Sequence, residues 1–321
     1  MPAIVLAAAV CAGLLTVLVL LYARRKGLLD APGERRSHAF ATPRGGGLSI
    51  VLVAGAGLAY FTYLGGHKFA PAALVGLILV AGVGWLDDHR DQSIRIRLAA
   101  HIVAAGLLAW GAGLDLSGAC CVFAITVVLI NVWNFMDGIN GIAASQTAVF
   151  AAVCAVLLNS PMGTALALLL LGACIGFLPF NFPRARIFMG DVGSGPLGFL
   201  IAVLLTLGLQ ETADPWGRLP LWFPLAPFLV DAGWTLLTRM VKGEAWWTAH
   251  VTHVYQLWSR RLGAHTPVTL AYLAVALAGA WLAIRIQAHE PDFIKFSLTL
   301  WYITLSIVWW LLRRQGVTRT F

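Results

Sequence analysis

The side chains best suited to chemistry are acids that stand beside glycine and asparagine where apolar stretches end. Asp87 and Asp88 are adjacent at the end of one such stretch and are followed by His89-Arg90-Asp91. Two neighbouring carboxylates repel each other unless a cation neutralises them. Mg²⁺ is commonly bound by one or two carboxylates together with substrate phosphates. The pair therefore indicates a divalent-metal and phosphate site; the alternative is a helix end whose acids are balanced by nearby arginines.

Asparagine and aspartate recur at every third position in a second stretch, at Asn131, Asn134 and Asp137. This spacing places the three side chains on one face of a helix end. Carboxamides are costly when they face lipid, so we expect them to face a cavity and bind a base or sugar, with Asp137 on a metal or ribose. Gly138 and Gly141 allow the chain to turn closely around a ligand. The alternative is an asparagine-rich cap between two helices.

A third stretch, Gly190-Asp191-Val192-Gly193-Ser194-Gly195, is rich in glycine and precedes an apolar segment. A glycine-rich turn that opens a helix presents backbone N–H groups to anions. Asp191 in this turn is suited to hold a metal against the same phosphates. Asn181 and Phe188 lie nearby, and the flat ring of Phe188 is available for stacking. A plain loop is the alternative, although it explains the glycines better than the acid.

Histidines occur in the longest polar segment, at His250 and His253, followed by Tyr255 and Gln256. The flanking tryptophans and arginines predict a short helix at the membrane interface. Histidines three residues apart could bind zinc, but no third ligand is evident, so we favour phosphate contact or proton handling. The alternative is a structural role at the interface.

A basic segment near the start of the chain supplies hydroxyls, a histidine and an arginine, at Ser37, His38, Thr42 and Arg44, before three glycines. Such a loop beside acidic metal sites suits phosphate binding, and it equally suits a positive membrane anchor.

Asp231 differs from the other acids because it lies well inside an apolar stretch. An intramembrane acid indicates a functional site by default, with Arg239 as a candidate partner. A helix-packing role through hydrogen bonds is the alternative.

The elements that must position these residues follow from the composition. The chain has 321 residues, of which 60% are hydrophobic and 11% charged. Soluble domains carry about 25% charged residues, so an ordinary cytosolic enzyme is excluded. A bilayer crossing needs roughly 20 apolar residues. We predict an all-α polytopic integral membrane protein, a single domain over 1–321 with about eleven spans near 3–22, 46–64, 69–86, 98–113, 117–134, 143–158, 162–180, 195–210, 219–238, 267–285 and 296–312.

Basic residues indicate the orientation of these spans. The first span is followed by Arg24-Arg25-Lys26, which predicts an external N-terminus. Eighteen Lys and Arg then fall in predicted cytoplasmic segments and four in external ones, which also explains the net charge of +8 without a nucleic-acid partner. The predicted cytoplasmic segments are 23–45, 87–97, 135–142, 181–194, 239–266 and 313–321. The C-terminus is therefore expected in the cytoplasm, and the first five segments are expected to form the active site.

Taken together, three ordered motifs resemble those of the polyprenyl-phosphate N-acetylhexosamine-1-phosphate transferases, which form glycosyl transferase family 4. They are Asp87-Asp88, the stretch from Asn131 to Gly141, and Phe188-Met189-Gly190-Asp191-Val192-Gly193-Ser194. The resemblance covers most of the chain, and the Ser37-to-Gly47 segment matches the family's first cytoplasmic loop.

The resemblance implies an enzyme of the bacterial inner membrane whose active site faces the cytoplasm. It implies Mg²⁺ or Mn²⁺ as cofactor, a UDP-activated N-acetylated amino sugar as donor and undecaprenyl phosphate as acceptor. The products would be a polyprenyl-diphosphate-linked sugar and UMP. The partners would also include membrane lipids, and a homodimer stays open.

The resemblance also implies residue roles. Asp87 would deprotonate or orient the acceptor phosphate with Asp88 beside it, and His250 and His253 would take part in catalysis. The metal would be bound by Asp191, with Asp88 and Asp137. The substrates would be bound by Ser37, His38, Thr42, Arg44, Asn131, Asn134, Asp137, Asn140, Asn181, Phe188 and Gln256.

The chain departs from the lipid I enzymes of this superfamily at two places. It has His-x-x-His-x-Tyr-Gln where they have consecutive histidines, and Asn140 where they have aspartate. The pattern is closer to the O-antigen-initiating group that uses 6-deoxy amino sugars such as N-acetylfucosamine or N-acetylquinovosamine. UDP-N-acetylglucosamine stays open as the donor.

Two rival functions fit part of the sequence. The run from Asp87 to Asp91 also fits the Asp-Asp-x-x-Asp motif of prenyl-transferring enzymes, although a second motif of that form is missing from the sequence. A transporter is the other rival, but transporters place ionisable groups near the midplane, and Asp231 alone is deep.

Overall fold

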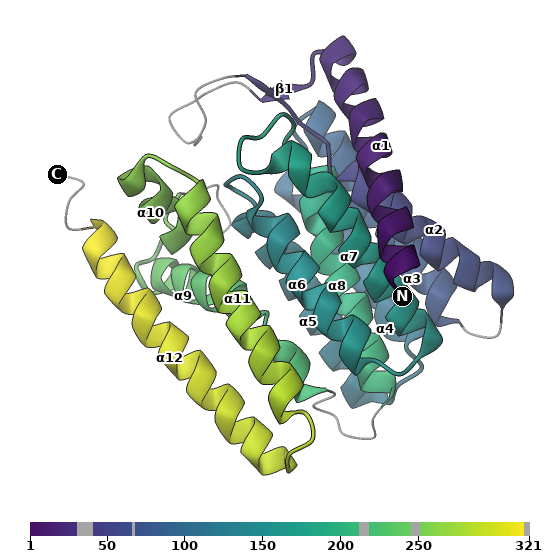
Figure 1. Cartoon of the computed structure of the whole chain (residues 1–321), viewed down its shortest axis with the longest axis vertical. Coiled ribbons are helices and arrows are strands. Elements are labelled where there is room, and N and C mark those ends of the chain that lie inside the picture. Colours follow the sequence, from purple (N-terminus) through teal and green to yellow (C-terminus); the bar gives the residue numbers. More distant parts are fainter. Residues whose placement is uncertain (31–40, 66–67, 212–217, 245–250, 318–321) are drawn as a thin grey trace.

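The computed structural model describes residues 1–30, 41–65, 68–211, 218–244 and 251–317. Within these ranges the regular elements are helices and one two-residue antiparallel ladder that pairs Leu29 with Pro43, joined by turns and loops (Figure 1). The elements are α1 (Pro2–Lys26), β1 (Leu29–Asp30), β2 (Thr42–Pro43), α2 (Leu48–Leu64), α3 (Phe69–His89), α4 (Ile94–Gly111), α5 (Leu116–Met136), α6 (Ile142–Leu157), α7 (Pro161–Asn181), α8 (Asp191–Gln210), the 3₁₀ helix η1 (Leu219–Trp222), α9 (Ala226–Val241), α10 (Val254–Leu262), α11 (Thr266–Ile286) and α12 (Pro291–Val317).

The predicted fold class, an all-α polytopic membrane protein, is confirmed. In the described part of the chain, eight helices are long and apolar enough to cross a membrane, and α2 and α6 are shorter apolar helices. The predicted span at 219–238 is not one continuous helix, because η1 ends at Trp222 and α9 begins at Ala226. The predicted count of eleven and the external N-terminus stay predictions.

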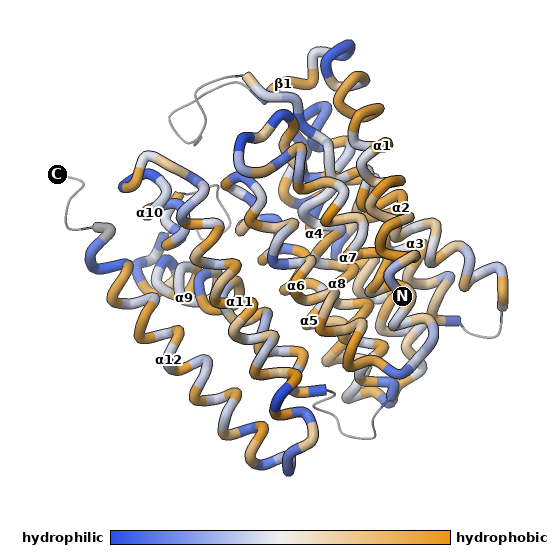
Figure 2. The backbone as a smooth tube through the Cα atoms, viewed as in Figure 1, coloured by the Kyte–Doolittle hydropathy of each residue, from blue (hydrophilic) through white to orange (hydrophobic). Residues whose placement is uncertain are grey.

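Helix α8 lies at the centre of the bundle. In its apolar stretch of 18 residues, 94% of the residues are buried. Helices α3 and α5 pack directly on α8, and α1 packs on α7. Helices α9 to α12 lie together on one side of this bundle (Figure 1). Figure 2 shows hydrophilic segments gathered at the ends of the bundle, with hydrophobic helix between them. The acidic motifs therefore lie at helix ends, where polar groups can meet water.

Glycines allow the helices that carry the motifs to approach each other backbone to backbone. A Cβ atom at Gly84 on α3 would overlap the carbonyl group of Asp191 on α8. A Cβ at Gly198 would overlap the Leu129 carbonyl, so α5 is held against α8 in the same way. A side chain at either position would force the helices apart. The close approach of α3, α5 and α8 is what brings their polar ends together.

Candidate active site

A polar cavity of about 250 Å³ lies where α3, α5 and α8 meet. It receives residues from all five of the segments predicted to form the site. The lining consists of Asp30, Arg44, Asp88, Asn134, residues 137–140, Asn181, residues 188–191, Ser194, Gln256 and His265. Most of the site predicted from the sequence is thus brought into one place.

Asp88 fixes the start of α8 against the end of α3. Its two carboxylate oxygens accept hydrogen bonds from the backbone N–H groups of Asp191 and Val192, at 3.1 Å each. Negative charge is stabilising at a helix N-terminus, where backbone N–H groups lack helical partners. The Arg44 guanidinium lies 3.9 Å from the same carboxylate. Asp88 is buried, so its charge is matched by amide dipoles and one cation.

Asp191 is held by a cation and a carboxamide. Arg97 Nη1 donates to Asp191 Oδ2 at 2.9 Å and to Asp87 Oδ2 at 3.1 Å, so one guanidinium bridges two carboxylates. Asn134 Nδ2 donates to Asp191 Oδ1 and to Ser194 Oγ, both at 3.0 Å. The site thus contains two acids bridged by a single arginine, which the sequence analysis did not include in the site.

Asp137 ends α5 and faces the same cavity. Burial raises the pKa of Asp137 to about 7, and the charge of Asp88 acts in the same direction. A carboxyl group in this setting is stabilised in its ionised form by a nearby cation. Asp137 is therefore a suitable ligand for a hard metal ion.

The oxygen donors fit a magnesium site that substrate would complete. No three acidic, histidine or cysteine side chains in the described residues converge as a full metal site. Mg²⁺ is usually held by one or two carboxylates plus substrate phosphates and water. Asp191 and Asp137 in one cavity meet that requirement.

Asn181 and Asn140 brace the loops that wall the cavity. Asn181 Oδ1 accepts from the Gly141 N–H at 2.7 Å, and its Nδ2 donates to the Ile187 carbonyl at 2.9 Å. Asn140 Nδ2 donates to the Pro183 carbonyl at 3.0 Å. Both carboxamides thus join the loop after α5 to the loop after α7. Phe188 also lines the cavity, with its ring available to a base.

The predicted short helix near the second histidine is confirmed as α10. Gln256 on α10 lines the cavity, and its Oε1 accepts from the His253 N–H at 3.3 Å. The His253 side chain is buried outside the lining, with Nδ1 3.8 Å from Asp231 Oδ1. His265, which the sequence analysis did not single out, does line the cavity. His265 lies in the predicted cytoplasmic segment 239–266, and this position was the one feature of the sequence that could have identified it.

Two further predicted residues, Thr42 and Asn131, are not part of the cavity lining. Thr42 is paired with Asp30 in the β ladder. Asn131 donates to the Val127 carbonyl at 2.7 Å and lines a neighbouring groove. Ser37, His38 and His250 lie outside the described residues.

That neighbouring groove is mainly apolar and adjoins the polar cavity. It has a volume of about 350 Å³ and shares Asn134 and Asp191 with the cavity. Apolar side chains of α3, α4, α5 and α9 form most of its wall, and Arg97 lies in its lining. An apolar chain in this groove would therefore end beside the bridged acids.

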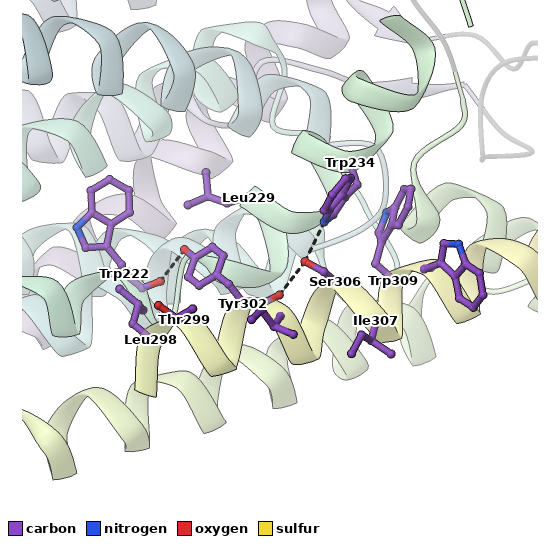
Figure 3. Close-up of a pocket in the computed structure, with 11 residues that line it drawn as sticks. Trp222, Leu229, Trp234, Leu298, Thr299, Tyr302, Ser306, Ile307 and Trp309 are labelled. Carbon is purple, nitrogen blue, oxygen red and sulfur yellow. Dashed lines mark hydrogen bonds between the residues drawn. The ribbon is translucent and has the colours of Figure 1, made fainter. Parts of the chain in front are cut away.

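A second apolar groove lies between α9 and α12, as Figure 3 shows. It has a volume of about 910 Å³ and is lined by eleven residues, all uncharged, including Trp222, Trp234 and Tyr302. Two of its polar side chains are paired within the protein: Trp234 Nε1 donates to Ser306 Oγ at 2.8 Å, and Tyr302 Oη donates to the Trp222 carbonyl at 3.0 Å. Since its lining includes no residue of the polar cavity, this groove is separate from that cavity.

Comparison with known proteins identifies the relatives of the chain. Residues 70–209 match the family described as "Glycosyl transferase family 4". Decaprenyl-phosphate N-acetylglucosaminephosphotransferase of Mycobacterium tuberculosis (strain H37Rv) is 34% identical over 66% of this chain, which spans 61% of the length of that relative. Phospho-N-acetylmuramoyl-pentapeptide-transferase of Synechococcus sp. (strain JA-3-3Ab) is 31% identical over 66% of this chain and 69% of its own length. A probable undecaprenyl-phosphate N-acetylglucosaminyl 1-phosphate transferase of Bacillus subtilis (strain 168) is 27% identical over 91% of this chain and 87% of its own length.

Proposed function

This chain belongs to glycosyl transferase family 4, and we propose that it transfers an N-acetylated amino-sugar 1-phosphate from a UDP-sugar to undecaprenyl phosphate. The names of its relatives, which combine polyprenyl phosphate with N-acetylglucosamine phosphate, support this reaction. The product would begin an O-antigen or another cell-envelope glycan, at the cytoplasmic face of the bacterial inner membrane.

One observation carries the proposal, namely that a polar cavity and an apolar groove share Asn134 and Asp191. The reaction joins an anionic nucleotide sugar, which needs a polar site, to a phosphate on a long apolar chain. The cavity suits the first and the groove suits the second. Their common boundary at Asp191 is where the two phosphates would meet.

The transfer forms one bond and breaks one bond. An oxygen of the acceptor phosphate attacks the sugar-bearing phosphorus of the donor, and the bond from that phosphorus to the oxygen of the UMP phosphate breaks. The leaving UMP carries the displaced electron pair. Arg97 would offset the charge of the approaching anions, because positioning and electrostatic stabilisation dominate phosphoryl transfer. Asp87, held by Arg97, would orient the acceptor phosphate or take its proton.

Magnesium or manganese would supply further neutralisation of the donor diphosphate when bound. Asp191 and Asp137 would hold it, and Asp88 would fix the start of α8 that carries Asp191. The chain's own contribution is therefore to hold two acids in the lining of one cavity.

The prenyltransferase rival fits the geometry less well. Asp87 is bound to Arg97, Asp88 is bound to the amides of α8, and Asp91 is exposed. These acids meet different partners, whereas an Asp-Asp-x-x-Asp clamp requires them to converge on one diphosphate.

Release of UMP tests the reaction directly. We expect the full chain in lipid nanodiscs to release UMP from at least one of UDP-N-acetylglucosamine, UDP-N-acetylfucosamine and UDP-N-acetylquinovosamine, and only when undecaprenyl phosphate and Mg²⁺ are present. Names of the relatives favour the first donor, whereas the sequence motifs favour the two 6-deoxy sugars. Release of inorganic diphosphate from a prenyl diphosphate, or solute accumulation in proteoliposomes without UMP, would contradict the proposal.

Blocking the groove beside Asp191 should weaken acceptor binding selectively. Val128 lines this groove and is 51% exposed. A Val128→Trp ring would exclude about two methylene groups of the acceptor chain, worth about 0.8 kcal/mol each, so the acceptor KM should rise about tenfold. The KM for the UDP-sugar should stay within about twofold. Initial rates of UMP release at varied acceptor concentration give both constants.

A matched control comes from the groove in Figure 3. Ile303 lines that groove and is also 51% exposed. Ile303→Trp should leave both KM values unchanged. The opposite pattern, with Ile303→Trp raising the acceptor KM and Val128→Trp not, would place the acceptor chain in the α9–α12 groove.

A further inference from the structure

Asp231 is the acid that the proposed reaction leaves without a role. It lies on α9, is 1% exposed and does not line the polar cavity. Its carboxylate accepts five hydrogen bonds from four helices. The donors are Thr235 Oγ1 (3.1 Å), the Val254 N–H (2.9 Å) and Trp309 Nε1 (3.1 Å) to Oδ1, and the Tyr255 N–H (3.1 Å) and Tyr272 Oη (2.6 Å) to Oδ2.

Two of these donors are the first backbone amides of α10. Amides at a helix start have no helical partner, and a carboxylate there is stabilising. Helix α10 has nine residues, and isolated helices of this length are marginal in water. The carboxylate of Asp231 therefore fixes where α10 begins and which way it points.

Helix α10 in turn supports the wall of the cavity. Tyr255 Oη donates to the Phe135 carbonyl at 2.9 Å, two residues before Asp137. Its ring lies so close to Gly138 that a Cβ atom there would overlap the Tyr255 hydroxyl. The next residue, Gln256, lines the cavity itself.

A second support runs through α11. Tyr272, which donates to Asp231, lies one turn after Thr269, whose hydroxyl donates to the Asn140 carbonyl at 2.8 Å. Two helices anchored at Asp231 thus reach the wall formed by residues 137–140.

We propose that Asp231 is a positioning residue for the sugar-donor half of the site, acting through α10 and α11 on Gln256 and on the wall from Asp137 to Asn140. The inference rests on the proposed transfer reaction for its kinetic readout. It assigns Asp231 a role in the site beyond the packing of the four helices.

The kinetic test separates positioning from simple packing. Asp231→Asn keeps the size of the side chain but removes its charge and one acceptor. We expect the KM for the UDP-sugar to rise about fivefold or more and the KM for undecaprenyl phosphate to change by less than about twofold. Simple destabilisation would lower kcat with the folded fraction and leave both KM values unchanged. That second result would overturn the inference.

Two further variants keep this test decisive. Tyr255→Phe removes only the hydroxyl that reaches Phe135, so it should raise the same KM even if Asp231→Asn folds poorly. Thr235→Val removes a donor to Asp231 that lies on its own helix, so it should leave both KM values unchanged.

In a double-mutant cycle, Asp231→Asn and Gln256→Ala should raise the donor KM by less than the product of the single effects, because both act through α10. Independent, multiplicative effects would contradict this route.

Hydrogen exchange gives a readout that does not depend on the reaction. In Asp231→Asn, amide exchange should accelerate in peptides covering 251–262 and also in those covering 135–141, with α1 to α4 unchanged. Exchange confined to α10 would overturn the inference, and so would a uniform increase. If the wild-type chain releases no UMP while this pattern holds, the proposed reaction fails and the structural coupling stands.

Discussion

Asp191→Asn is expected to lower UMP release by about 10²–10³-fold while leaving the protein folded. Asp191 lies at the boundary of the cavity and the groove and is held by Arg97 at 2.9 Å and Asn134 at 3.0 Å. Asparagine has nearly the same size and shape as aspartate but carries no negative charge to bind a metal or Arg97. Removing one preorganised electrostatic contact to a transition state typically costs this much in kcat.

The measurement is UMP release by nanodisc-embedded protein at saturating donor and acceptor, with the melting temperature recorded for each variant. Asp292→Asn is the matched control, since the Asp292 side chain is 96% exposed and forms an ion pair with Lys295 one turn further along α12. Exposed ion pairs contribute about 0–1 kcal/mol, so this control should keep wild-type activity. An Asp191→Asn protein that retained more than about a tenth of wild-type turnover would show that the reaction does not use this carboxylate.

Gly84→Ala is expected to abolish most activity, although it adds a single methyl group at a distance from substrate. The new Cβ would overlap the Asp191 carbonyl, which is backbone and cannot rotate away. Overpacking of this kind costs about 1–3 kcal/mol and shifts the backbone. A displacement of about 1 Å at a reacting group can cost about 10²-fold in rate. Turnover should therefore fall further than the folded fraction does.

Gly82→Ala provides the control for this substitution in the same helix. A Cβ at Gly82 meets nothing within 4 Å, and alanine is favoured over glycine in helices by up to about 1 kcal/mol. We expect Gly82→Ala to be as active as the wild type and equally or more heat-stable. If the two variants had the same melting temperature and the same rate of UMP release, α3 and α8 would tolerate a wider separation than their packing indicates.

The fold was largely predictable because apolar length is a strong signal. Ten of the eleven predicted spans each correspond to one helix, and the glycine-rich turn at Asp191 does open one. The split of the ninth span between η1 and α9 was not predictable from hydropathy. Its residues are mostly apolar apart from Asp231, so hydropathy runs through the break at Phe223–Leu225, in which Pro224 lies.

Most residues of the site could be predicted from the sequence, but the contacts between them could not. Adjacent acids and spaced asparagines identified the residues, because such groups are costly unless they face a cavity. The partners were not predictable. Arg97 was a nearby basic residue in the sequence, yet it bridges Asp87 and Asp191 across 94 positions. Asp88 resembled a metal ligand, yet both its oxygens meet amides of α8. Sequence spacing carries no information on contacts of this range.

The bond between Asp88 and the amides at the start of α8 has a consequence for biogenesis. The two partners are 103 positions apart, and α4, α5, α6 and α7 are made between them. A growing chain therefore inserts α3 with a carboxylate that has no amide partner until α8 emerges. Arg44 precedes α3 and can balance the charge, but burial of a carboxylate without its hydrogen-bond partners is costly. The end of α3 that carries Asp88 is therefore expected to remain hydrated during this interval. Docking of α8 would then close the bundle and assemble the cavity in one late event, so the nascent protein acquires its catalytic centre only after most of its helices are in the membrane.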